Sequence, residues 1–239
     1  MLVYNVIPLR GGTYWYLRTC EGLVVQAMKP PVPTPIYHFT HVDNLTGILG
    51  AEGVLCNNNC EFDRVSVAYG HLQRRRNRIE VPRRPYGNLH DYVPFYFCYR
   101  PPMLYAIHSG EVTSYKGGQD ALVYLVSNVQ DVKEAGLDFV FTDRSALYDY
   151  AGFYTSTANL KKVDWSIMPG KWWNNTVDYP DRKECKQAEF LVHKFFSWEL
   201  VAFLAVKTPQ MQRRVESLLD GHPSSTRRPV WIKPSWYYL

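Results

Sequence analysis

The chain has 239 residues, of which 46% are hydrophobic, and its formal net charge is +5. This length and composition suffice for one substantial hydrophobic core or two small ones. No uninterrupted apolar segment is long enough to span a bilayer, which argues against an integral membrane protein. No Gly/Ser-rich linker or low-complexity tract divides the sequence, so we expect a single domain.

The first 34 residues differ from the rest of the chain. They lack a continuous apolar stretch behind a charged start, and they lack a clear cleavage site, so they do not resemble a signal peptide. Prolines at positions 30, 31, 33 and 35 favour an extended lead-in with few hydrogen bonds. We therefore expect an N-terminal extension over 1–34 and one folded domain over 35–239, with Met28 as a hypothetical natural initiator.

The domain opens with a predicted strand at 36–40 and a helix that runs to about Gly50, before a short strand at 54–55 and a polar loop at 57–63. Residues 64–79 then predict a longer helix. With Leu72 as reference and about 100° per residue, Arg76 falls on the same apolar stripe as Ile79, whereas Arg74 and Arg78 point to the opposite side. An inward guanidinium needs an anionic or polar partner, which serves either structure or function.

Short strands and helices alternate irregularly over the remaining chain. We expect strands at 91–99, 122–126, 139–142, 198–206 and 230–232, and helices at 101–107, 129–135, 146–159 and 210–219. The polar segment 164–184 is a long loop that contains three tryptophans, and loops of this length in compact domains are usually functional or mobile. This order predicts an α+β fold with a split or mixed sheet.

The stretch Cys185–Phe196 places one carboxylate, Glu189, in front of a continuous apolar run. Such a run, rich in aromatic and branched residues, is typical of a buried strand. A buried carboxylate is costly unless it is paired or hydrogen-bonded. Glu189 is therefore either a group at the edge of the core that faces a cleft or a solvated residue at the entrance of a strand.

Charge and aromatic content indicate a possible class of ligand. Arginines 64, 74, 75, 76, 78, 83, 84 and 100 share one stretch with only two acidic residues, and such a cluster faces phosphates or is a solvated surface. Aromatic residues make up 15% of the chain, which serves core packing or base stacking. The five cysteines have irregular spacing, and Cys56 and Cys60 lack a second pair at zinc-site spacing. We expect free thiols, no metal and a cytosolic protein.

Several segments, taken together, resemble the DarT toxins. The resemblance rests on five segments in the same order, covering the chain from about Pro35 onwards: Tyr37–Leu49, Ala68–Arg78, His90–Phe97, Phe139–Asp143 and Lys186–Val192. DarT toxins are ADP-ribosyltransferases that modify thymidine in single-stranded DNA, and their partner is a macrodomain antitoxin with ADP-ribosyl hydrolase activity.

The resemblance implies the ADP-ribosyltransferase fold, in which two small split sheets form a cleft for NAD⁺ and helices lie at the periphery. It implies that Arg76 and Glu189 are catalytic and that the cleft around NAD⁺ is lined by residues His38, Phe39, Thr40, Gly47, Leu55, Arg76 and Tyr96. The stretch from about Cys60 to Arg78 is then a lid over the co-substrate, and the segment before Glu189 recognises the acceptor. The expected DNA contacts are Arg74, Arg75, Arg78 and Lys171.

The chemistry of the reaction agrees with these roles. Cleavage of the nicotinamide–ribose bond develops positive charge that a carboxylate stabilises, as Glu189 would. Arginine is a poor base. We therefore expect Arg76 to lower the pKa of the thymine base and hold its developing anion, while the proton passes to Glu189 or water.

Two alternatives stay open at the level of the sequence. The same chemistry could serve a protein, RNA or guanine acceptor, and Gln187 holds a position that could tune this choice. The other alternative is a non-catalytic module that binds single-stranded nucleic acid. Consumption of NAD⁺ separates the enzyme from the binding module.

Overall fold

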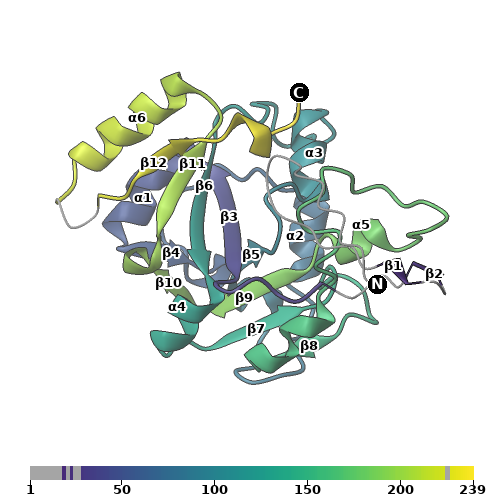
Figure 1. Ribbon diagram of the computed structural model, residues 1–239. Helices are drawn as coiled ribbons and strands as arrows, with labels where there is room; N and C mark the ends of the chain where they lie inside the picture. Colours follow the sequence, from purple (N-terminus) through teal and green to yellow (C-terminus); the bar gives the residue numbers. More distant parts are fainter. Residues whose placement is uncertain (1–17, 20–21, 24–27, 224–226) are drawn as a thin grey trace.

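The computed structural model describes residues 18–19, 22–23, 28–223 and 227–239 (Figure 1). Most of the N-terminal extension proposed over 1–34 lies outside these residues, so the domain boundary expected at position 35 is described only on its C-terminal side. Strands β1 (Arg18–Thr19) and β2 (Gly22–Leu23) pair with each other within it. No helix among the described residues is long and apolar enough to cross a membrane, and the 12 residues of α6 (Pro209–Asp220) illustrate the scale.

The centre of the fold is an eight-stranded mixed sheet with the order β12-β11-β6-β3-β5-β9-β7-β8. Neighbouring strands of this sheet run antiparallel, except for β11 and β12, which are parallel. The strands are β3 (Pro35–His41), β5 (Tyr92–Tyr96), β6 (Leu122–Asn128), β7 (Phe139–Thr142), β8 (Phe153–Tyr154), β9 (Glu189–His193), β11 (Phe203–Val206) and β12 (Val230–Ile232). A second small sheet joins β4 (Gly53–Leu55) to β10 (Phe195–Ser197).

The large sheet divides in the middle. Strand β3 pairs with β6 over all seven of its residues, but it meets β5 only at Tyr37 and Tyr96. The sheet therefore consists of two four-stranded halves, β12-β11-β6-β3 and β5-β9-β7-β8, that diverge on either side of this contact. The split sheet expected from the sequence is present, and the divergence opens a space between the halves.

The helices surround the sheet (Figure 1). Besides α6, they are α1 (Leu45–Gly50), α2 (Gly70–Arg76), α3 (Pro102–His108), α4 (Val129–Glu134) and α5 (Arg182–Cys185). Helix α6 packs beside β11 and β12, and it begins where Thr208 accepts a hydrogen bond from the backbone N–H of Met211. Short 3₁₀ turns include η2 (Asn57–Asn59), η3 (Leu89–Asp91), η4 (Thr157–Lys162) and η5 (Trp198–Leu200).

Strand β9 is buried on both faces, which explains its continuous apolar sequence. Phe190 and Val192 belong to the main hydrophobic core, whereas Leu191 points into a smaller cluster on the other face with Val140 and Leu89. A strand covered on both faces loses the polar alternation of a half-exposed strand. The buried strand predicted from this run is present, with Glu189 as its first residue, but it ends at His193. Lys194 has a φ of +62° and separates it from β10, which contains Phe195 and Phe196 and belongs to the second sheet.

Several predicted elements were wrong in extent or type. The strand expected at 91–99 spans only Tyr92–Tyr96. The helix expected at 64–79 spans only Gly70–Arg76, because the Asn44 side chain binds both backbone groups of Val65, at 2.8 and 3.0 Å. The helix expected at 146–159 is absent, since Phe153 pairs with Thr142 as strand β8. The strand expected at 198–206 starts only at Phe203, after the turn η5, which Ser197 caps.

Candidate active site

The space between the two sheet halves is a cavity of about 500 Å³. Its walls come from β3, β5, α2, the segment 54–57 and the start of β9, so residues far apart in sequence meet there. A volume of this size is within the usual range for small-molecule sites, roughly 300–1,000 Å³.

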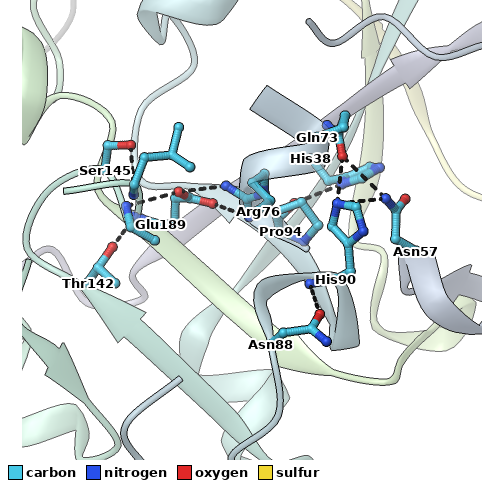
Figure 2. Close-up of polar contacts among 12 residues, drawn as sticks. His38, Asn57, Gln73, Arg76, Asn88, His90, Pro94, Thr142, Ser145 and Glu189 are labelled. Atoms are coloured by element: carbon cyan, nitrogen blue, oxygen red, sulfur yellow. Dashed lines mark hydrogen bonds and ion pairs between the residues drawn. The ribbon is translucent and has the colours of Figure 1, made fainter. Parts of the chain in front are cut away.

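Helix α2 delivers Arg76 into this cavity at its last residue. The side chain is only 13% exposed, and its guanidinium faces Glu189 (Figure 2). Nη1 donates a hydrogen bond to Oε1 at 3.0 Å, and Nη2 lies 2.8 Å from Oε2. The second contact lacks hydrogen-bond alignment, so the buried Nη2 keeps an N–H without an acceptor among the described residues. The anionic partner that an inward Arg76 requires is therefore Glu189.

Glu189 is held in place by its surroundings as well as by Arg76. Its Oε1 accepts a hydrogen bond from the backbone N–H of Ala146 at 3.3 Å, and its own N–H donates to Thr142 Oγ1 at 3.0 Å (Figure 2). The side chain is 4% exposed. Burial alone would lower the pKa of Arg76, but the charge of Glu189 and their hydrogen bond together raise it above its usual value. The guanidinium consequently stays cationic.

His38 is a neutral hydrogen-bond acceptor in the cavity wall. Its Nδ1 lies 2.8 Å from the carbonyl oxygen of Pro94, and this oxygen can only accept, so Nδ1 carries the proton and Nε2 offers a lone pair. Burial lowers the pKa of His38 to about 4, with a smaller contribution from the charge of Arg64. Protonation of His38 at neutral pH is thus disfavoured.

Most of the other predicted co-substrate residues also line the cavity. Phe39 stacks on Tyr96 with ring centroids 5.9 Å apart, and Thr40 and Leu55 complete this part of the wall. Gly47 does not line the cavity. A β-carbon at Gly47 would overlap the ring of Phe62, which lines the cavity. The missing side chain of Gly47 therefore lets the Phe62 ring pack against α1 and hold its place in the cavity wall.

The four residues predicted to contact DNA lie outside the cavity. Arg74, Arg75 and Arg78 are exposed, and Arg75 Nη2 donates to the backbone oxygen of Leu147 at 2.5 Å. Lys171 is exposed beside Trp172, with its Nζ 4.9 Å from the ring centroid, and Trp172 is 65% exposed. The structure brings none of these four side chains to Glu189.

A buried lysine anchors the start of the loop 164–184. Lys186 is fully buried, and its Nζ donates to the backbone oxygens of Ile167, Met168 and Gly170. Lysine is rarely buried in full unless it has partners, and here three carbonyls use all three N–H donors. Because Lys186 is three residues from Glu189, it ties this loop to the strand that carries the carboxylate.

The sequence analysis missed a polar cluster at the other end of the cavity. Asn57, Gln73 and His90 join one another through contacts of 3.0–3.2 Å (Figure 2). The available signal was weak. Gln73 lies one helical turn before Arg76, and both Gln73 and His90 fall within the segments that resemble DarT. Arg64 also lines the cavity.

The cysteines do not form a metal site within the described residues. Cys56, Cys60, Cys98 and Cys185 are free thiols, and no group of three or more His, Cys, Asp or Glu residues in this part of the chain could hold a metal ion. Cys20 lies outside the described residues.

Comparisons with known proteins agree in fold and family. A family model described as "ssDNA thymidine ADP-ribosyltransferase, DarT" matches residues 37–238. A DNA ADP-ribosyl transferase of Thermus sp. (strain 2.9) is 48% identical over 208 residues, which cover 87% of this chain and 98% of the relative. A DNA ADP-ribosyl transferase of Mycobacterium tuberculosis is 35% identical over 226 residues, which cover 91% of this chain and 96% of the relative.

Solved structures extend the likeness to the fold. Thermus sp. 2.9 DarT in complex with ADP-ribosylated ssDNA superimposes with a TM-score of 0.86 and 45% identity, covering 89% of this chain and 100% of that chain. The same protein in complex with NAD⁺ superimposes with a TM-score of 0.81 and 43% identity, covering 88% of this chain and 100% of that chain.

Proposed function

Because the chain belongs to the DarT family of ssDNA thymidine ADP-ribosyltransferases, we propose that its cleft transfers ADP-ribose from NAD⁺ to thymidine in single-stranded DNA, releasing nicotinamide. The observation that carries this proposal for these residues is the buried contact between Arg76 and Glu189 at the end of the cavity. A module that only binds a DNA backbone has no need of a buried ion pair in a cleft.

The cavity suits NAD⁺ in volume and chemistry. Its aromatic residues, including Phe39, Tyr96 and Phe62, offer faces for flat rings, and His38 Nε2 offers an acceptor for a ribose hydroxyl. Arg64 supplies positive charge for the pyrophosphate at the exposed side of the cavity. We assign these roles to the cavity residues, together with Thr40 and Leu55.

Glu189 acts through its charge. Cleavage of the nicotinamide–ribose bond builds positive charge on the ribose. A carboxylate held by the backbone N–H of Ala146 and by Arg76 stabilises that charge without reorganising. Nicotinamide leaves as a neutral molecule, so this step requires no acid. The same carboxylate can accept a ribose hydroxyl and hold the sugar ring.

Arg76 acts on the acceptor base. A thymine ring nitrogen must lose its proton before it attacks the anomeric carbon, and the resulting anion is delocalised onto the adjacent carbonyl oxygens. The Nη2 N–H that has no acceptor is available to such an oxygen, and the guanidinium keeps its charge throughout. The proton passes to Glu189 or to water.

The loop 164–184 contributes the acceptor surface. It carries three cation–aromatic pairs, namely Lys171 on Trp172, Lys183 on Trp173 and Arg182 of α5 on Tyr179 of the loop. Positive charge beside exposed rings suits an unpaired strand, whose bases can stack. A duplex hides the thymine ring, so single-stranded or flipped-out substrate is required.

The test uses NAD⁺ and two short single strands that are identical except that one lacks thymine. The expected result is a mass gain of one ADP-ribose on the thymine strand alone. NAD⁺ consumption without a gain on either strand would move the acceptor to protein or RNA, and no consumption at all would overturn the enzymatic function.

We further propose a macrodomain antitoxin as partner and the cytoplasm as location. Family membership supports the first, and the four free thiols, which a reducing compartment maintains, support the second. A macrodomain hydrolase should remove the label from the modified strand, and cell fractionation should recover the enzyme with cytoplasmic proteins. A strand that resists the hydrolase, or recovery outside the cytoplasm, would reject the corresponding part.

A further inference from the structure

A second cavity, of about 420 Å³, lies at the end of the sheet half opposite to Glu189. Its lining includes Arg83, Arg84 and Tyr86 from the segment between α2 and β5, and Phe139 at the start of β7. Phe139 pairs with Val192 of β9, and Val192 lies three residues after Glu189. At the usual rise of a strand, three residues correspond to about 10 Å between Glu189 and the strand position beside the groove. This groove is therefore separate from the cleft but close enough for one flexible ligand to reach both.

The segment that carries the two arginines is a fixed hairpin. Val81 N–H donates to Gly87 O at 2.8 Å, Glu80 bridges Asn88, and the Tyr92 hydroxyl donates to Tyr86 O at 2.6 Å. Tyr86 has a φ of +65° and is 55% exposed. A tyrosine in the left-handed region is strained, and here it presents an aromatic ring to solvent at the groove.

The groove carries a net positive charge, because its lining contains Arg83 and Arg84 and one carboxylate, Asp138. Arg83 Nε donates to the backbone oxygen of Phe153 at 3.2 Å, which positions the guanidinium beside β8. Within the described part of the chain, Arg83 and Arg84 form no ion pair. Cations on other faces do, among them Lys194 with Asp91 and Lys207 with Asp120.

The same absence of ion pairs, within residues 28–223 and 227–239, extends to Arg74, Arg75 and Arg78. Arg75 binds the backbone at Leu147, next to the Ala146 that contacts Glu189, and Arg83 binds it at Phe153. The two segments 75–86 and 147–153 thus lie side by side. Arg75 and Arg83, neither of which has a carboxylate partner within the described residues, lie along this seam between the cleft and the groove.

We propose that the groove of Arg83, Arg84 and Tyr86 is a second subsite for the single-stranded DNA acceptor, occupied by nucleotides distant from the target thymidine. Two guanidiniums and an exposed ring match a phosphodiester with an unpaired base. The proposal rests on the proposed function, because it assumes a DNA acceptor. A strand that is too short to leave the cleft gains nothing from this subsite, whereas a longer strand does.

The test compares Arg83→Gln/Arg84→Gln and Tyr86→Asn with the wild type on a five-nucleotide and a twenty-nucleotide strand that share one thymidine. Asparagine tolerates a positive φ, so the second variant removes the ring without new strain. The expected result is a KM for the long strand raised about tenfold, within the range for the removal of one base-stacking ring, and an unchanged KM for the short strand. The salt dependence of long-strand binding should weaken by about 0.7 for each phosphate that the variant no longer neutralises.

The control is Arg213→Gln/Arg214→Gln on α6, which removes the same formal charge from adjacent exposed residues beside β12, although Arg214 pairs with Asp43. It should leave both strands unaffected. Equal effects of the groove variants on both strands, or no effect on the long strand, would overturn the subsite. Failure of the wild type to modify even the short strand would instead reject the proposed function.

Discussion

Replacing Glu189 by glutamine removes the carboxylate charge that faces Arg76 and leaves a buried guanidinium without a counter-charge. The Arg76 and Glu189 side chains are 13% and 4% exposed, so water screens the loss poorly. Breaking a buried pair costs about 3–5 kcal/mol. Glutamine keeps one oxygen for Nη1 and for Ala146 N–H, but its amide nitrogen would face Nη2. We therefore expect a loss of about 3 kcal/mol in the free energy of unfolding.

Urea denaturation at pH 7 measures this loss as a lower midpoint at an unchanged slope. The double variant Arg76→Met/Glu189→Gln should recover part of it, because no buried charge remains. Asp120→Asn, which breaks an exposed ion pair with Lys207, is the control and should cost at most about 1 kcal/mol. A loss below about 1 kcal/mol for Glu189→Gln, or additive losses in the double variant, would refute the reasoning.

Three further predictions concern the rest of the site. The free energy of unfolding of the wild type should fall as the pH drops from 6.5 towards 4, because His38 takes up a proton in the unfolded chain but not in the folded protein. Denaturation at a series of pH values should show that His38→Asn removes about 3 kcal/mol of this dependence. The same dependence of unfolding free energy on pH in both proteins would contradict the prediction. Gly47→Ala should displace Phe62 and weaken NAD⁺ binding about tenfold in calorimetry, whereas unchanged affinity would disprove a role for this close approach. Lys186→Met should leave three carbonyls without their donor and destabilise the protein by about 3 kcal/mol. It should also raise the KM for DNA more than the KM for NAD⁺. An equal rise in both KM values would contradict a positioning role for Lys186.

Local patterns drew attention to Arg76 and Glu189, but the resemblance to DarT was needed to propose them as the catalytic pair. Arg76 falls on an apolar stripe of the predicted helix, and Glu189 precedes a continuous apolar run, a pattern that fits either a group at the edge of the core or a solvated residue. Helical and strand periodicity carry this information without knowledge of the tertiary structure. Both residues do lie inside, and they face each other.

Long-range contacts explain what the sequence could not reveal. Helix α2 is shorter than its pattern because Asn44, 21 residues away, binds the backbone of Val65. The polar cluster of Asn57, Gln73 and His90 depends on three separate segments meeting at one end of the cavity. Periodicity within a segment does not specify such meetings.

The most direct test of the central claim is the intact mass of a thymine-containing single strand after reaction with NAD⁺ and either the wild type or Glu189→Gln. Both proteins are first shown to be folded and to bind NAD⁺ under the assay conditions. The wild type should add one ADP-ribose, and the variant should leave the strand unmodified, because the charge that stabilises bond cleavage is gone. A variant that binds NAD⁺ and modifies the strand at the wild-type rate would contradict the assignment of the reaction to the Arg76–Glu189 pair.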